Sequence, residues 1–306
     1  MIEKAVILAA GSATRMQPQI ERYVRDKDEL AAIRKGEKMA ARFGKFPFLD
    51  YQLLNLVRSG LKKINLVLKP EDDFFRKHYD MKGRIIFPEV EISYSFQEVA
   101  DGTAHALYAA RAFIEKDRFL LLNGDNNYSK NAIRMLMDSP EGVSALVAYD
   151  VDGFNRWTKE RLGTFAVIRV SGGRLVEIVE KPENPLDYKT SDYLYTLGNG
   201  KVEVWERVLT SMNLWCFTMD IVDACRIVPR HAPRKPGKPG EYELPDAVKI
   251  LLERGRKVMV YYACEDVLDL TRAEDIAVVS EQIRKNLTDS IEELKIRYSC
   301  LWKSSC

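Results

Sequence analysis

The stretch AVILAAGSATRM at residues 5–16 combines small residues with a cation. An apolar run leads into Gly11 and its small neighbours, where a permissive backbone lets N–H groups approach an anion closely. Arg15 follows at once, and a guanidinium can hold phosphate oxygens through two hydrogen bonds. Ala13 and Met16 replace the later glycines of the dinucleotide fingerprint, and the Gly-Lys pair of the P-loop is absent. The stretch therefore indicates another kind of phosphate loop, with an ordinary strand-to-helix turn as the alternative.

Asp125 is the second candidate, in the segment FLLLNGDNNYS at 119–129. It comes directly after an apolar run that predicts a buried strand. Ligands of parallel sheets bind beyond the carboxyl ends of the strands. Mg²⁺ prefers one or two carboxylates together with phosphate oxygens and waters. Asp125 is thus a candidate magnesium ligand, although aspartate is also common in turns of this kind.

Lys181 is the third candidate, in the motif VEKP at 179–182 that follows LGTF at 162–165. The next residue, Pro182, restricts the backbone, so the lysine would present its charge at a fixed place. A solvated strand end is the alternative for so short a motif.

The elements that must position these residues alternate along the chain. Apolar runs predict strands at 4–9, 63–68, 91–96, 118–122, 143–149, 164–170, 174–180, 212–217 and 257–262. Helical patterns lie at 50–59, 72–79, 102–114, 130–138, 219–226, 243–254 and 273–297. The βαβα order of the first half predicts an α/β fold with a mainly parallel sheet covered on both faces. The turn SGGR at 171–174 adds an antiparallel hairpin, and 231–245 is expected to be a long exposed loop.

Composition limits the classes of partner. Lys and Arg number 47 against 45 Asp and Glu, so no overall basic field points to nucleic acid. No run approaches the ~20 apolar residues of a membrane helix, and the N-terminus lacks a signal peptide's pattern. The five cysteines have no CxxC spacing, which favours a reducing compartment. We therefore expect a cytoplasmic globular protein without nucleic-acid or membrane partners, whose three histidines are structural or on the surface.

An ordered set of motifs carries a resemblance that no single motif carries. In chain order the sequence contains LAAGSATRM, GKFPFLDYQL, FQEVADGTAHAL, LLNGDNNY, LGTFAVI, VEKP, MNLWCFT, GEYELPDAV and DVLDLTRAED. Over about residues 3–280 this set resembles the sugar-phosphate nucleotidyltransferases, or sugar-nucleotide pyrophosphorylases. The resemblance implies one GT-A-like (Rossmann-like) domain over 1–280 with a mixed, mostly parallel sheet. A helical tail at 281–306 is expected to pack on the same domain.

The resemblance also implies residue roles. Arg15 and Lys38 would hold the triphosphate, with Lys35 or Lys45 as alternatives to Lys38 because the family's Pro-Lys pair is missing here. Asp125 and Asp269 would bind Mg²⁺, and Lys181 would hold the attacking phosphate. The implied catalytic set is Arg15, Lys38, Asp125 and Lys181. The implied nucleotide-binding set is Ala9, Ala10, Gly11, Ser12, Ala13, Thr14, Arg15, Gln97, Gly102, Thr103 and Asp125. The implied sugar-phosphate set is Asn126, Gly163, Glu180, Lys181, Asn213 and Glu241.

The activity that the resemblance implies is transfer of a nucleotidyl group from a nucleoside triphosphate to a sugar 1-phosphate, with release of pyrophosphate. Gln97 offers both a donor and an acceptor, which favours UTP or dTTP. A non-sugar acceptor, such as a phosphocholine-like or polyol phosphate, and a non-catalytic sugar-nucleotide sensor are the alternatives. The charged segment 19–37 is expected to be a solvated helix or a lid over the triphosphate. The protein is expected to be a monomer or a homodimer.

Overall fold

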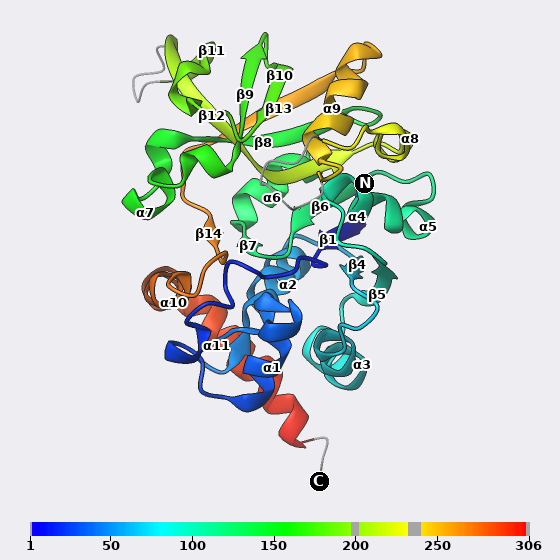
Figure 1. The fold of residues 1–306 in the computed structure, drawn as a ribbon, viewed down its shortest axis with the longest axis vertical. Coiled ribbons are helices and arrows are strands. Elements are labelled where there is room, and N and C mark those ends of the chain that lie inside the picture. Colours follow the sequence, from blue (N-terminus) through cyan, green and yellow to red (C-terminus); the bar gives the residue numbers. More distant parts are fainter. Residues whose placement is uncertain (1, 197–201, 232–239, 304–306) are drawn as a thin grey trace.

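The computed structural model describes residues 2–196, 202–231 and 240–303. Its described helices are α1 (Lys27–Lys35), α2 (Phe48–Arg58), α3 (Phe74–Ile86), α4 (Thr103–Ala109), α5 (Arg111–Ile114), α6 (Lys130–Met137), α7 (Arg156–Lys159), α8 (Asp220–Ile227), α9 (Leu244–Glu253), α10 (Asp275–Asn286) and α11 (Thr288–Lys303). Figure 1 shows α1, α3 and α11 at the opposite end of the molecule from strands β9–β13.

One large mixed sheet organises the chain. Along the sheet its strands are β5 (Glu91–Phe96), β4 (Lys63–Leu68), β1 (Lys4–Leu8), β6 (Phe119–Asn123), β12 (Val202–Phe217), β8 (Ser144–Asp150), β13 (Val258–Ala263), β10 (Arg174–Glu180) and β9 (Ala166–Ser171). The first four run parallel, as do β8 and β13. Strand β12 runs antiparallel to β6, β8 and β9, and also pairs with β11 (Lys189–Thr196). The predicted mixed α/β fold is confirmed, and SGGR forms the β9–β10 hairpin.

The sheet separates two apolar layers. Along β1, Ala5 and Ile7 belong to one buried cluster and Val6 to the other, because successive side chains point to opposite faces of a strand. Helices α2, α3, α6, α10 and α11 contribute to the first cluster. Helices α4, α8 and α9 contribute to the second. Strands covered on both faces read as continuous apolar runs, which is why FLLL was recognisable.

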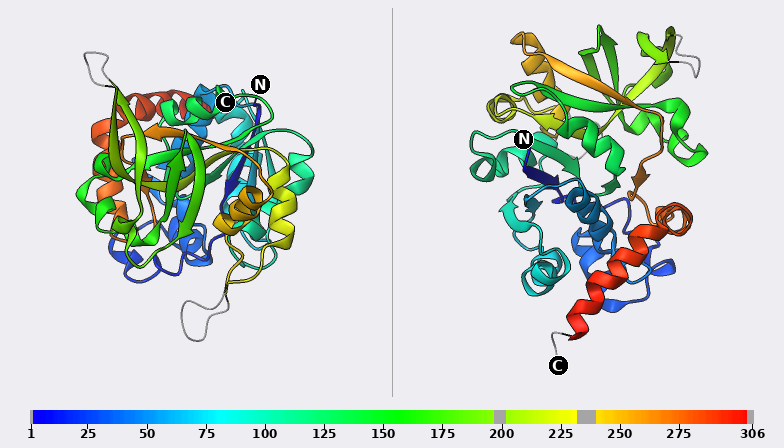
Figure 2. Two further views of the ribbon diagram at one scale, coloured as in Figure 1. Left: turned by 90° about the horizontal axis from the view of Figure 1, so that it is seen from above. Right: turned by 180° about the vertical axis from the view of Figure 1, so that it is seen from behind.

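Short strands and 3₁₀ turns occur in the segments that connect the larger elements. The short strands are β2 (Arg42–Phe43), β3 (Phe46–Pro47), β7 (Asn126–Asn127) and β14 (Leu268–Asp269). The described 3₁₀ turns are η1 (Ile20–Arg22), η2 (Lys38–Ala40), η3 (Val151–Gly153), η4 (Leu162–Thr164) and η5 (Pro185–Asp187). Figure 2 shows the whole fold from above and from behind.

Several predicted bounds differ from the structure. The helix expected at 273–297 is two helices, because Leu287 leaves the helical conformation at φ −120° and ψ 33°. The helix expected at 102–114 is likewise divided, between α4 and α5. The strand expected at 212–217 is the end of the 16-residue β12. Of the loop expected at 231–245, residues 232–239 lie outside the described residues. Among those described, no helix combines the length and apolar character needed to span a bilayer.

Candidate active site

A cavity of about 610 Å³ opens at the carboxyl ends of β1 and β6. Residues from every predicted set line it: the loop 9–15, Lys38, Gln97, Gly102, Thr103, Asp125, Asn126, Gly163, Glu180, Lys181, Asn213, Glu241 and Asp269. Of the three lysines proposed for the triphosphate, Lys38 is at the lining, whereas Lys35 and Lys45 are not part of it. The structure thus gathers side chains that are as far apart in the sequence as Ala9 and Asp269.

The small-residue loop leaves β1 with its backbone fixed at both ends. The Ala9 N–H donates to Val67 O at 2.9 Å, and Met16, fully buried, donates to Ala13 O at 2.9 Å. The left-handed conformation falls on Ala13, at φ 50°, and Gly11 does not adopt it. The expectation that Gly11 supplies the permissive backbone is therefore corrected. The space around Gly11 is open, since an added Cβ would meet no protein atom within 4 Å.

Asp125 and Asp269 are brought together by the ladder between β7 and β14. Asp269 lies opposite Asn126, and the Leu270 N–H donates to Asp125 O at 2.8 Å. Gly124 lies just before, where there is little room for a side chain, because a Cβ would lie 3.0 Å from Leu8 O. Two carboxylates 144 residues apart therefore share one corner of the cavity.

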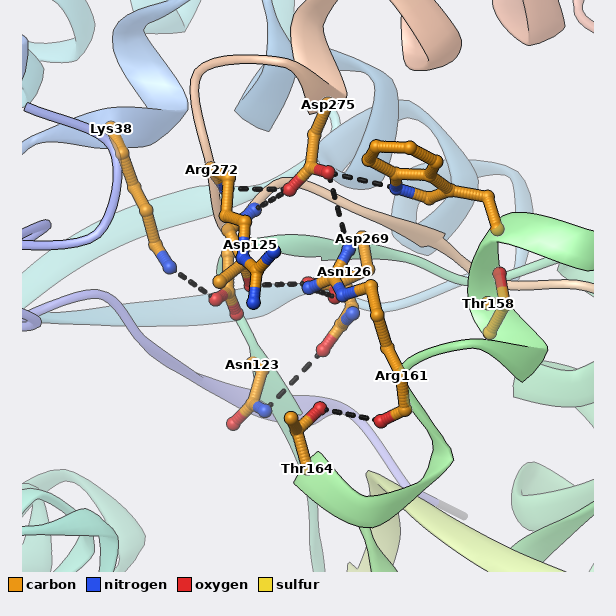
Figure 3. A network of polar contacts seen from close by, with 12 residues as sticks. Lys38, Asn123, Asp125, Asn126, Thr158, Arg161, Thr164, Asp269, Arg272 and Asp275 are labelled. Carbon is orange, nitrogen blue, oxygen red and sulfur yellow. Dashed lines mark hydrogen bonds and ion pairs between the residues drawn. The ribbon is translucent and has the colours of Figure 1, made fainter. Parts of the chain in front are cut away.

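Each of these carboxylates pairs with a cation of the chain itself. Lys38 Nζ pairs with Asp125 Oδ2, and Arg161 Nη2 pairs with Asp269 Oδ2 (Figure 3). Burial raises the pKa of Asp269 to about 6; the Arg161 charge acts against this shift and the Asp125 charge adds to it. Two neighbouring carboxylates repel each other, and a cation bound between them relieves this repulsion.

Sequence reasoning missed Arg161, which lines the cavity, and Asp275, which pairs with it. Arg161 Nη1 lies 3.2 Å from Asp275 Oδ1, which also accepts from Trp157 Nε1 at 2.9 Å. Arg161 lies in the charged run RWTKER, which resembles a solvated helix, so no local signal marked it. Only its position two residues before Gly163 could have suggested a place near the site.

The wall near α4 is built from Gln97, Gly102 and Thr103. Gln97 is buried and its Nε2 donates to Gly102 O at 3.0 Å, which fixes the carboxamide. Gly102 has φ 103°, and a Cβ there would lie 2.4 Å from Tyr242 O, so no larger residue fits. Thr103 Oγ1 accepts from the Leu244 N–H at 2.8 Å.

The far end of the cavity contains Lys181 among carboxylates. Lys181 Nζ lies 2.5 Å from Glu180 Oε1 and 3.4 Å from Glu243 Oε1. Glu243 was missed by sequence reasoning, which selected the exposed Glu241 two residues earlier; both line the cavity. Asn213 stands at a bulge of β12 with φ 57°, where its Oδ1 accepts from Trp215 Nε1 at 3.3 Å.

A mixed α/β sheet that carries a small-residue loop and a carboxylate pair, surrounded by cations, defines an α/β enzyme that handles phosphate groups. The sequence profile of the nucleotidyl transferase family matches residues 4–286, and the chain belongs to this family. The predicted family membership is thereby confirmed.

Similar proteins agree with this assignment. A UTP-glucose-1-phosphate uridylyltransferase of Haloferax volcanii is 28% identical, over 94% of this chain and 100% of its own length. A glucose-1-phosphate thymidylyltransferase of Neisseria meningitidis serogroup A is 27% identical, over 82% of this chain and 72% of its own length. A crystal structure of UDP-glucose pyrophosphorylase complexed with UDP-glucose has a TM-score of 0.65 at 18% identity, covering 93% of this chain and 99% of its own. This last likeness concerns the fold, which is the predicted GT-A-like type.

Proposed function

We propose that the protein transfers a nucleotidyl group from a nucleoside triphosphate to a sugar 1-phosphate, giving a nucleotide sugar and pyrophosphate. The observation that carries this proposal is the single cavity that unites the small-residue loop, the carboxylate pair and the Lys181 end. The named activities of the uridylyltransferase and thymidylyltransferase relatives support the same reaction.

The carboxylate pair suits a magnesium ion. Asp125 and Asp269 offer hard oxygen ligands, and their proximity helps to raise the pKa of Asp269. Within the described ranges, no group of three or more His, Cys, Asp or Glu residues is arranged to hold a metal. The two aspartates would therefore hold Mg²⁺ together with nucleotide oxygens, which is its usual environment. When bound, the ion would neutralise phosphate charge in the transition state.

The chain's own residues would position two anions for direct displacement. Backbone N–H groups of the loop 9–15, with Arg15 and Lys38, would hold the triphosphate. Lys181 would hold the phosphate of the acceptor so that its oxygen faces the α-phosphorus in line with the leaving pyrophosphate. Positioning and charge neutralisation supply most of the rate in such transfers, so no covalent intermediate is needed.

Substrate choice rests on two ends of the cavity. The Gln97 carboxamide, oriented by Gly102, suits the amide edge of uracil or thymine, so UTP or dTTP is proposed. Carboxylates of Glu180, Glu241 and Glu243 at the other end suit the hydroxyl groups of a sugar. Use of a non-sugar phosphate and nucleotide-sugar sensing without turnover are the competing functions.

The test is a panel of UTP, dTTP, GTP, CTP and ATP against several sugar 1-phosphates, phosphocholine and a polyol phosphate with Mg²⁺, with pyrophosphate release as the readout. We expect release with UTP or dTTP and a hexose 1-phosphate. Release only with phosphocholine or a polyol phosphate would identify the non-sugar acceptor. Tight nucleotide-sugar binding by calorimetry without turnover would identify a sensor.

A further inference from the structure

We propose that Arg161 is an exchangeable counter-ion. In the free enzyme it pairs with Asp269. When a divalent cation binds Asp269 instead, the freed N–H groups of Arg161 pair with a substrate phosphate. This inference rests on the proposed function, because it assumes that the cation binds at Asp125 and Asp269. The Arg161 side chain is 9% exposed and lines the cavity.

The guanidinium of Arg161 is divided between two carboxylates. Nη2 faces Asp269, and Nη1 faces Asp275 at 3.2 Å (Figure 3). A planar fork of this kind can release one partner while it keeps the other. The exchange therefore requires no movement of the backbone that carries Arg161.

Asp275 is the partner that Arg161 would keep in both states. It has no exposed surface, and its Oδ2 accepts from the N–H groups of Thr271 and Arg272 at 2.7 and 2.6 Å. Its Oδ1 accepts from Trp157 Nε1 as well as Arg161. These donors hold the Asp275 carboxylate in place whatever happens at Asp269, so it keeps the guanidinium beside the cavity.

The charges of the cluster explain why an exchange is favourable. Lys38 and Arg161 bring two positive charges against the three carboxylates of Asp125, Asp269 and Asp275, so the cluster has one surplus negative charge without a metal. A buried carboxylate requires such a partner, since an unpaired buried charge is strongly destabilising. A divalent ion bound to Asp125 and Asp269 turns this into one surplus positive charge. That charge would be shared by Lys38 and Arg161, which line the cavity where a triphosphate would bind.

The experiment measures Mn²⁺ binding to the free protein by calorimetry, without nucleotide, and separately measures turnover. Arg161→Met removes the group that competes with the cation for Asp269. Mn²⁺ should therefore bind roughly tenfold more tightly, which corresponds to about 1.4 kcal/mol of binding free energy. Turnover should nevertheless fall by about 10²-fold or more, because the substrate phosphate loses the positive charge of Arg161 that would stabilise it. Arg58→Met is the matched control, since Arg58 pairs with Glu293 at helix α11 and should leave both values unchanged.

Tighter Mn²⁺ binding together with slower turnover in Arg161→Met distinguishes the exchange from a purely structural role of Arg161. Unchanged or weaker Mn²⁺ binding by folded Arg161→Met would overturn the inference while leaving the cation site standing. Absence of Mn²⁺ binding by the unmodified protein, or unchanged binding by Asp269→Asn, would overturn the cation site and the inference together. If Arg161→Met does not fold, Arg161→Lys carries the test: a single ammonium cannot hold both aspartates, so Mn²⁺ should again bind more tightly than to the unmodified protein.

Discussion

Asp125 and Asp269 are the residues on which the proposed chemistry depends most directly. Asparagine at either position keeps the shape and removes one charge from the cation's ligands. We expect Asp125→Asn and Asp269→Asn to lower kcat by about 10²-fold or more, with an unchanged circular dichroism spectrum. Asp266→Asn is the matched control, because Asp266 is also hydrogen-bonded, to Asn155, yet is not part of the cavity lining. An Asp269→Asn enzyme with full Mg²⁺-dependent activity would contradict the shared-metal assignment.

Lys181 should affect one substrate only. Its ammonium lies between Glu180 and Glu243, at the end of the cavity that we propose for the acceptor. We expect Lys181→Ala to raise KM for the sugar 1-phosphate by about tenfold or more and to leave KM for the nucleotide nearly unchanged. Lys189→Ala, which removes an exposed lysine paired with Glu206, serves as the control in the same steady-state assay. An equal rise of both KM values would place Lys181 elsewhere in the mechanism.

The site residues that could be predicted share a local signature. Gly11 to Arg15 and Asp125 directly follow apolar runs, so strand ends and small residues made them visible. The arginine that pairs with Asp269 could not be found in this way, because the contact joins residues 108 positions apart. Likewise, nothing local distinguishes Glu243 from Glu241, and only the packing of α9 against α4 decides which one contacts Thr103.

At the scale of elements, helix α1 ends at a junction that positions Lys38. Gly36 caps α1 at φ 116°, and Lys69 Nζ donates to Lys35 O. A Cβ on Gly36 would lie 2.7 Å from both Gly11 O and Lys69 Nζ. The end of α1 is therefore packed directly on the small-residue loop, with Lys38 following at once.

We expect Gly36→Ala to raise KM for the nucleotide triphosphate more than tenfold, a loss of over about 1.4 kcal/mol, because the added methyl group pushes Lys38 and the loop apart. Gly60→Ala is a matched control: Gly60 also has a positive φ, 94°, but a Cβ there meets nothing within 4 Å. It shares the backbone strain and lacks the clash. If both variants lower stability equally and neither changes KM, the junction has no role in positioning Lys38.

Glu37, in the same junction, should make stability depend on pH. It is fully buried, and burial, with the Asp72 charge added, raises its pKa to about 7. The folded state thus favours protonated Glu37, a stabilisation present below pH 4.5 that is lost as pH rises through 7. Above that pH the folded state must bury an ionised Glu37, which is costly. Glu37→Gln removes the ionisable group, so the free energy of unfolding at pH 8 should rise by on the order of 2–3 kcal/mol. Urea denaturation at pH 5 and 8 measures the free energy of unfolding, with the exposed Glu21→Gln as control. A larger stabilisation by Glu37→Gln at pH 5 than at pH 8 would contradict the raised pKa of Glu37.

Sequence patterns predicted elements well where burial is uniform and poorly where the chain changes direction. The parallel strands β1, β4 and β6 were identified to within about a residue because both faces are covered. The length of β12 was missed, since it crosses from the covered sheet to an outer hairpin and contains a bulge at Asn213. The break at Leu287 was missed because the apolar stripe continues through it.

At the scale of the whole molecule, helix α11 closes the end furthest from β9–β13 (Figure 2). Tyr298 donates to Asp50 Oδ2, and Tyr79 donates to Asp50 Oδ1 at 2.8 Å. Asp50 has no exposed surface, so its two oxygens depend on donors within the protein. The C-terminal helix is thereby linked to α2 and α3 by a buried polar contact.

We expect Tyr298→Phe to lower the free energy of unfolding by about 1–3 kcal/mol, because one oxygen of a buried carboxylate loses its donor. Catalytic constants should change little, since α11 lies away from the cavity. Tyr94→Phe is the control, because it removes an exposed bond to Asp80 and should cost less than about 0.5 kcal/mol. Guanidinium denaturation compares the two, and equal losses would show that Asp50 does not depend on α11.

The ladder between β7 and β14 also sets an order in time. While the ribosome makes the chain, Asp125 emerges 144 residues before Asp269, a delay of roughly 7–30 s at about 5–20 residues per second. Throughout that interval the strands β1, β4, β5 and β6 and the small-residue loop have already been made, yet the growing chain has only one of the two carboxylates. The closing of β14 onto β7 is thus a late event of synthesis, and before it the growing chain cannot assemble its complete site.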